Sequence, residues 1–159
     1  MSAEDLSSQT ARESLFFLLQ VRLQKTRQQI SDVFWTLRAL DTLCDSLAVL
    51  LHHERSLAVA AAIALVGAEA ESLAGYAQRQ GWLLRRPWHP DWLLEYWWEA
   101  SVVQAADGVC EEVKTLAHLL LDAAEYAPLG WEAPLLECAG RLLRVAAVLR
   151  QALDSTDSL

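Results

Sequence analysis

The chain has 159 residues, of which 53% are hydrophobic and 21% are charged, and its formal net charge is −8. These values are typical of one folded domain and exclude an intrinsically disordered chain. The negative charge argues against direct binding to nucleic acid or to anionic membrane surfaces, because both contacts need a basic surface.

Leu and Ala dominate the composition, and no Gly or Pro occurs before Gly67, which predicts helix nearly throughout. We therefore expect an all-α, four-helix bundle-like domain. The N-terminal residues lack the pattern of a signal peptide, and the longest uncharged apolar run, residues 57–68, is shorter than the ~20 residues of a membrane span. We expect a cytoplasmic protein with a flexible N-terminus (1–9), one helical domain (10–153) and a flexible tail (154–159).

Apolar residues at three-four spacing predict a long first helix, over about 10–53, that packs along one seam. Thr10 is the expected N-cap, with Glu13 completing a capping box. Unbroken, such a helix would be ~66 Å long, which exceeds the diameter of a domain of this size. Part of it must therefore project, pair with another chain, or break near residues 28–31. The seam comprises Phe16, Leu19, Leu23, Thr26, Ile30, Val33, Leu37, Leu40, Cys44, Leu47 and Leu51.

A turn at 52–56 is predicted to lead into a central, Ala-rich helix at about 57–79, with Ser56 as its N-cap. Gly67 and Gly75 lie in this helix. Small residues on a helix allow a neighbouring helix to approach closely, so we expect a tight crossing there.

Two further helices complete the predicted bundle, at about 91–126 and about 134–153. The sequence APLG at 127–130 separates them, since Pro and Gly both disfavour continued helix. The last helix carries an apolar seam of Leu135, Ala139, Leu142, Ala146, Leu149 and Leu153.

Negative charge is concentrated in residues 91–137, where ten acidic residues stand against one base, Lys114. Part of this charge recurs at helical spacing and forms an outer stripe on the third helix. The solvent face of an amphipathic helix explains it most simply, although a nearly uniform negative face would also attract a basic partner. The stripe comprises Asp107, Glu111, Lys114, His118, Asp122 and Glu125.

The stretch RRPWHPDWLLEYWW, at 85–98, holds four of the seven tryptophans. Extending the core face of the third helix backward places Asp91, Glu95 and Glu99 on it, so the tryptophans point elsewhere. The helix either bends near residues 100–101 or its start leaves the bundle. The tryptophans then cap the bundle, line a pocket for a small ligand, or form a protein contact with the composition of a hot spot. The residues expected at that contact are Arg85, Arg86, Trp88, Trp92, Tyr96, Trp97 and Trp98.

No catalytic or metal-binding motif occurs in the sequence, which lacks Glu-x-x-His pairs, Cys-x-x-Cys and Gly-rich phosphate loops. Cys44, Cys110 and Cys138 lie far apart, which predicts small buried residues in a reducing compartment and no disulfide. We therefore expect a protein that is not an enzyme and that uses no cofactor or metal.

The leading hypothesis is a small acidic protein-interaction module that binds a partner protein, as adaptors, inhibitors and immunity proteins do. In a narrower form, the acidic face mimics nucleic acid and binds a protein with a basic surface. The long first helix also predicts a homodimer, because Phe16, Leu19 and Leu23 would otherwise each forgo roughly 1.5–3 kcal/mol of burial. The alternative is a ligand-binding or sensor domain whose aromatic pocket contains Trp82, Trp88, Trp92 and Tyr96.

Overall fold

The computed structural model describes residues 3–84 and 101–157, and this part of the chain contains four helices. The all-α bundle predicted from the sequence is confirmed, and the described ranges contain no strand. Residues 91–100 of the predicted third helix lie outside the described ranges. The helices are α1 (Ala3–His53), α2 (Leu57–Arg79), α4 (Val102–Ala124) and α5 (Glu132–Asp157).

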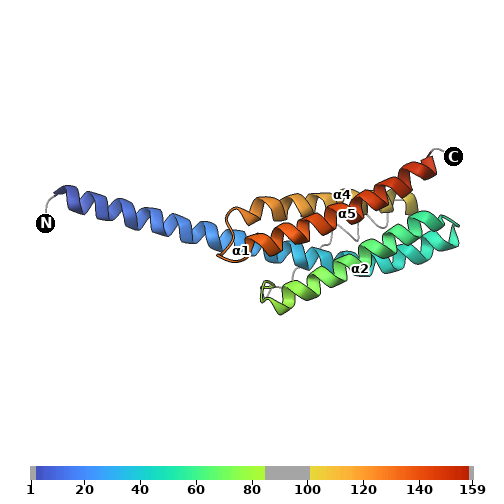
Figure 1. The fold of residues 1–159 in the computed structure, drawn as a ribbon, viewed down its shortest axis with the longest axis horizontal. Coiled ribbons are helices and arrows are strands. Elements are labelled where there is room, and N and C mark those ends of the chain that lie inside the picture. Colours follow the sequence, from blue (N-terminus) through green and yellow to red (C-terminus); the bar gives the residue numbers. More distant parts are fainter. Residues whose placement is uncertain (1–2, 85–100, 158–159) are drawn as a thin grey trace.

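The four helices form a ring in which each helix packs against two neighbours (Figure 1). α1 lies against α2 and α4, and α5 lies against the same two helices. The core fills the space between them, and every residue of the predicted α5 seam, from Leu135 to Leu153, is at most 3% exposed. The seam of α1 is buried from Ile30 to Leu51. The apolar periodicity therefore identified the core faces of both helices correctly.

α1 is one continuous helix of 51 residues, ~76 Å long at 1.5 Å per residue. It begins at Ala3, so the prediction of Thr10 as its N-cap was wrong. The bundle already holds the C-terminal half as helix, so each additional N-terminal residue only propagates the helix and avoids the cost of nucleation. The helix does not break at 28–31. Instead its N-terminal part projects beyond the other helices (Figure 1).

The crossing of α1 and α2 is tight at Gly67. A Cβ added to Gly67 would lie 3.0 Å from the Cβ of Cys44 on α1, so the close approach predicted for the small residues of α2 is confirmed there. Ser56 is the N-cap residue of α2, as predicted, although its side chain makes no capping hydrogen bond. Arg55, at φ 62°, reverses the chain between the two helices.

Of the described helices, α2 alone is long and apolar enough to cross a membrane, with a mean hydropathy of 1.7 over its most apolar window. Half of that window is buried inside the bundle. The buried half packs against α1 and α5, so α2 is one of the four core helices of the bundle and not its centre.

A capping box sets the start of α4. The Ser101 hydroxyl accepts a hydrogen bond from the Gln104 amide at 3.2 Å, and the Gln104 side chain accepts one from the Ser101 amide at 3.1 Å. The backbone of Ser101 is extended, with φ −65° and ψ 162°. Because Ser101 is not helical, a continuous helix over about 91–126 is excluded, and a bend near residues 100–101 was one of the two alternatives expected.

Candidate interaction surfaces

The first surface is the projecting part of α1, residues 3–25, which we call the arm (Figure 1). Thr26 is the first buried residue of α1. Every described side chain before it is exposed, apart from that of Leu23, which is half-buried. At 1.5 Å per residue the arm is ~34 Å long, and its apolar residues contribute almost nothing to the core.

The arm carries an uninterrupted apolar run at 15–19, followed by Val21. Five successive residues of a helix point in all directions around its axis, so the apolar surface encircles the arm. Side chains of this size and exposure present on the order of 600 Å² together, whereas monomeric proteins rarely expose apolar patches above a few hundred Å². The exposed fractions are 58% for Leu15, 63% for Phe16, 64% for Phe17, 62% for Leu18, 57% for Leu19 and 46% for Val21.

The sequence predicted part of this surface. Phe16 and Leu19 were expected to need a partner because they belong to the α1 seam, and both are exposed. Leu15, Phe17 and Leu18 were missed, because they lie off that seam and a single-stripe pattern ignores them. The signal that could have identified them is the run itself, since five apolar residues in succession cannot all face one neighbouring helix.

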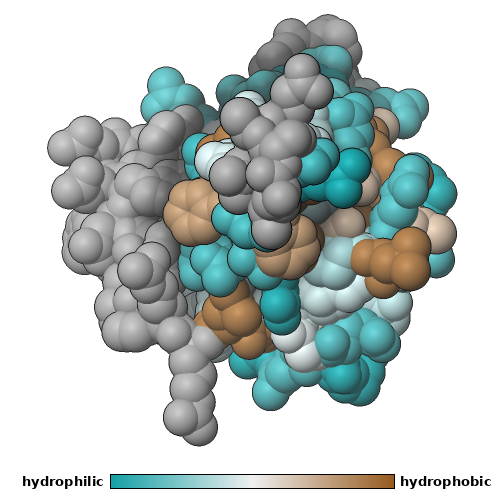
Figure 2. Space-filling view, turned by 90° about the vertical axis from the view of Figure 1, so that its left-hand side faces the viewer, coloured by the Kyte–Doolittle hydropathy of each residue, from teal (hydrophilic) through white to brown (hydrophobic). Residues whose placement is uncertain are grey.

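Residues 22–27 of α1, where the arm meets the bundle, are called the root. The loop between α4 and α5 lies beside the root, and we call residues 126–131 of this loop the shoulder. The Arg22 guanidinium lies 3.7 Å from the centre of the Tyr126 ring, and that of Arg27 lies 5.6 Å from the centre of the Trp131 ring. Leu129 is fully exposed and Tyr126 is 45% exposed. Figure 2 views the molecule from the side on which the arm projects and shows exposed apolar side chains among polar ones.

The acidic stripe on α4 is partly neutralised by α5. The Arg150 guanidinium donates hydrogen bonds to Asp107 at 2.5 Å and to Glu111 at 3.1 Å. The hydrogen bond to Asp107 raises the pKa of Arg150 above its ordinary value. Asp122 and Glu125, farther along the stripe, are exposed. The face is therefore mixed in sign where α5 adjoins it and acidic toward the shoulder.

The tryptophan-rich stretch at 85–98 lies outside the described residues, so the contact predicted there stays a prediction. Of the aromatic residues expected to line a ligand pocket, the structure describes Trp82, which is 3% exposed and belongs to the core. Its ring packs against three others at centroid distances of 5.6 Å to Phe34, 5.4 Å to Tyr76 and 5.2 Å to Trp131.

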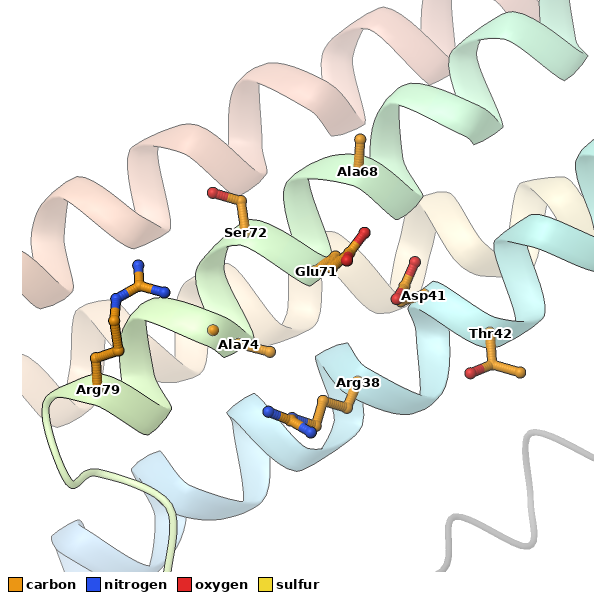
Figure 3. Close-up of a pocket in the computed structure, with 9 residues that line it drawn as sticks. Arg38, Asp41, Thr42, Ala68, Glu71, Ser72, Ala74 and Arg79 are labelled. Carbon is orange, nitrogen blue, oxygen red and sulfur yellow. The ribbon is translucent and has the colours of Figure 1, made fainter.

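A groove of about 690 Å³ lies between α1 and α2, and its lining is mainly polar (Figure 3). Asp41 on α1 and Glu71 on α2 extend into the same gap from facing helices. Burial, together with the charges of Asp45 and Glu71, raises the pKa of Asp41. Arg38 and Arg79 also line the groove. Its chemistry is polar and charged, unlike the aromatic pocket expected from the sequence.

The three cysteines are free and buried, as predicted. Burial raises the pKa of the Cys44 thiol to about 12 and that of the Cys138 thiol to about 11. At neutral pH both thiols stay protonated and therefore poorly nucleophilic. Within 3–84 and 101–157, no group of three or more His, Cys, Asp or Glu side chains could hold a metal ion.

No family model, curated protein or solved structure matches this chain.

Proposed function

We propose that the protein is an interaction module that acts by binding another polypeptide through the arm of α1. The observation that supports this proposal is the apolar run at 15–19, which encircles a helix that projects from a folded bundle. Each exposed Leu or Phe forgoes roughly 1.5–3 kcal/mol of burial. The core, which begins at Thr26, does not use these side chains, so a contact with another molecule is the simplest reason for them.

A binding role as an adaptor, inhibitor or immunity-type protein fits such a surface better than a catalytic role. The narrower form, in which the acidic stripe mimics nucleic acid and binds a basic protein, has less support. A phosphate backbone presents regularly spaced charges, whereas Arg150 binds two of the stripe's carboxylates, those of Asp107 and Glu111. A cytoplasmic location stays part of the proposal, and free buried cysteines are compatible with it.

Purification from the native host tests the proposal when wild-type protein is compared with two charged variants, Leu19→Glu and Leu57→Glu. Leu19 on the arm is 57% exposed and Leu57 on α2 is 56% exposed, so the two substitutions are closely matched. We expect wild-type and L57E protein to retain a specific polypeptide that L19E protein loses, with mass spectrometry as the measurement. A second copy of the chain counts as such a polypeptide.

The proposal fails if L19E protein retains every bound polypeptide at the wild-type level. It also fails if nothing is enriched and wild-type protein stays monomeric. Circular dichroism of the three proteins provides the control for folding, since both leucines are exposed and neither substitution removes a core contact.

A further inference from the structure

We infer that the polypeptide bound by the arm is a second copy of this chain, with the two arms antiparallel and the tip of each arm beside the other copy's shoulder. This inference rests on the proposed function and names the partner of the same surface. It is carried by the distribution of charge along the arm, by the position of the apolar run and by the exposed side chains of the shoulder.

Charge is divided unevenly along the arm. The outer part carries three acids, Glu4, Asp5 and Glu13, with one base, Arg12, whereas the root, residues 22–27, carries three bases and no acid. The guanidinium groups of Arg22 and Arg27 lie over aromatic rings of the shoulder. Parallel arms would place like charge beside like charge. Antiparallel arms place each acidic tip beside the basic root of the other copy, and such complementarity fixes the orientation of a complex.

The apolar run is positioned so that this arrangement also brings tip and shoulder together. Its centre, Phe17, lies nine residues, or ~14 Å, from the first buried residue, Thr26, and ~18 Å from Asp5 near the tip. When the runs of two copies lie side by side, Asp5 extends ~4 Å past Thr26 of the other copy. The shoulder is at that level, because Arg22 and Arg27 of the root both contact it, and it exposes Tyr126 and Leu129.

The symmetry of the contact fits a closed dimer. Two arms together present on the order of 1,200 Å² of apolar surface; an antiparallel pair buries the sides that face each other, and the two tip-to-shoulder contacts add to the buried area. Antiparallel arms are related by a two-fold axis, so each tip-to-shoulder contact forms twice and neither a tip nor a shoulder is left unpaired for further chains. A dimer rather than a filament is therefore expected.

Sedimentation velocity tests the second copy directly, on full-length wild-type, Leu19→Glu and Leu57→Glu protein at about 1 to 100 µM. We expect a dimer for wild-type and L57E protein and a monomer for L19E protein. A wild-type protein that remains monomeric over this range overturns the inference, and so does an L19E protein that dimerises as the wild type does.

Disulfide trapping tests the orientation. Gln9 and Gln24 are both exposed, on either side of the apolar run, and single Gln9→Cys and Gln24→Cys variants of different tag mass are mixed and oxidised. Antiparallel arms give disulfides that join a Q9C copy to a Q24C copy, whereas parallel arms join each variant to its own kind and overturn the inference. Wild-type protein is the control, because its three cysteines are buried.

If the arm contacts something other than a second copy of the chain, these experiments give different results. If wild-type protein is a monomer that retains a host protein lost by L19E, the inference fails and the proposed function stands. If the monomer instead binds vesicles of phosphatidylcholine and phosphatidylglycerol, and L19E does not, the arm contacts a bilayer and both proposals fail. If L19E lowers the melting temperature of a monomeric chain far more than L57E does, the arm packs within its own chain and both fail again.

Discussion

The Arg22 guanidinium lies 3.7 Å from the centre of the Tyr126 ring, which joins the root of the arm to the loop between α4 and α5. Arg22 precedes Thr26, the first buried residue of α1. The contact therefore attaches one further turn of α1 to the bundle, beyond the turns that the core holds. It also fixes the direction in which the arm projects from the bundle.

Replacing Arg22 with Gln is expected to loosen the arm without unfolding the bundle. An exposed cation–π contact contributes about 0.5–1 kcal/mol, so global stability should change little, while amides of residues 15–22 should exchange hydrogen faster. Exchange measured by mass spectrometry in the monomeric Leu19→Glu background isolates the effect. Arg12→Gln, farther out on the arm, is the matched control, and equal exchange in the two variants would show that Tyr126 does not hold the root.

Two glycines in helices should respond in opposite ways to Ala. At Gly140 on α5 an added Cβ meets no atom within 4 Å, so Gly140→Ala should raise the free energy of unfolding by about 0.5–1 kcal/mol through helix propensity. At Gly67 the added Cβ lies 3.0 Å from the Cβ of Cys44. That atom is fixed to the backbone of α1, so overpacking should outweigh propensity and Gly67→Ala should cost about 1 kcal/mol. Urea denaturation measures both changes, and a stabilised G67A protein would contradict the tight crossing.

Trp82 is expected to behave as a core residue and not as part of a ligand site. Trp82→Ala removes a ring that is 3% exposed and packs against three other aromatic rings, which should lower the free energy of unfolding by about 3–5 kcal/mol. Leu57→Ala, at a position that is 56% exposed and lies outside the proposed dimer contact, is the control and should change stability far less. A W82A protein as stable as the wild type would return Trp82 to the candidates for ligand binding.

Stability should fall at alkaline pH because of the buried thiols. The pKa of Cys44 is raised from 9.0 to about 12 and that of Cys138 from 9.0 to about 11, so above pH 9 the unfolded chain releases these protons first. The thiol contribution to stability is therefore fully present below pH 9 and is lost as the pH rises toward 11 and 12. Denaturation at about pH 8 and about pH 10 measures the fall, which should be smaller in a Cys44→Ala, Cys138→Ala double variant. An equal fall in the free energy of unfolding of the wild type and of the double variant would show that groups other than these thiols cause it.

The sequence predicted the bundle because apolar spacing reports which face of a helix can be buried. The spacing does not show whether another helix covers that face. The residues Ile30 and Leu37 of the seam are buried, whereas Phe16 and Leu19, which continue the same spacing, are exposed. Local capping rules placed the start of α1 at Thr10, but propagation from a helix already held by the bundle outweighed them.

Contacts between distant segments leave no local pattern. The ion pair of Arg150 with Asp107 joins residues 43 positions apart, so the acidic stripe looked more uniform in the sequence than it is in the fold. The position of the shoulder beside Arg22 and Arg27 likewise depends on how α4 ends relative to α1, which periodicity alone does not determine.

α1 contains no glycine or proline, so the arm and one side of the bundle are parts of a single stiff rod. A rotation of about 10° at the root would move the tip by ~6 Å over its ~34 Å length. Conversely, a load at the tip acts as a torque about the root, and the rod transmits it to the crossing where Cys44 meets Gly67. The arm can therefore act as a rigid lever that turns about its contact with the shoulder, while the rest of α1 is held in the core.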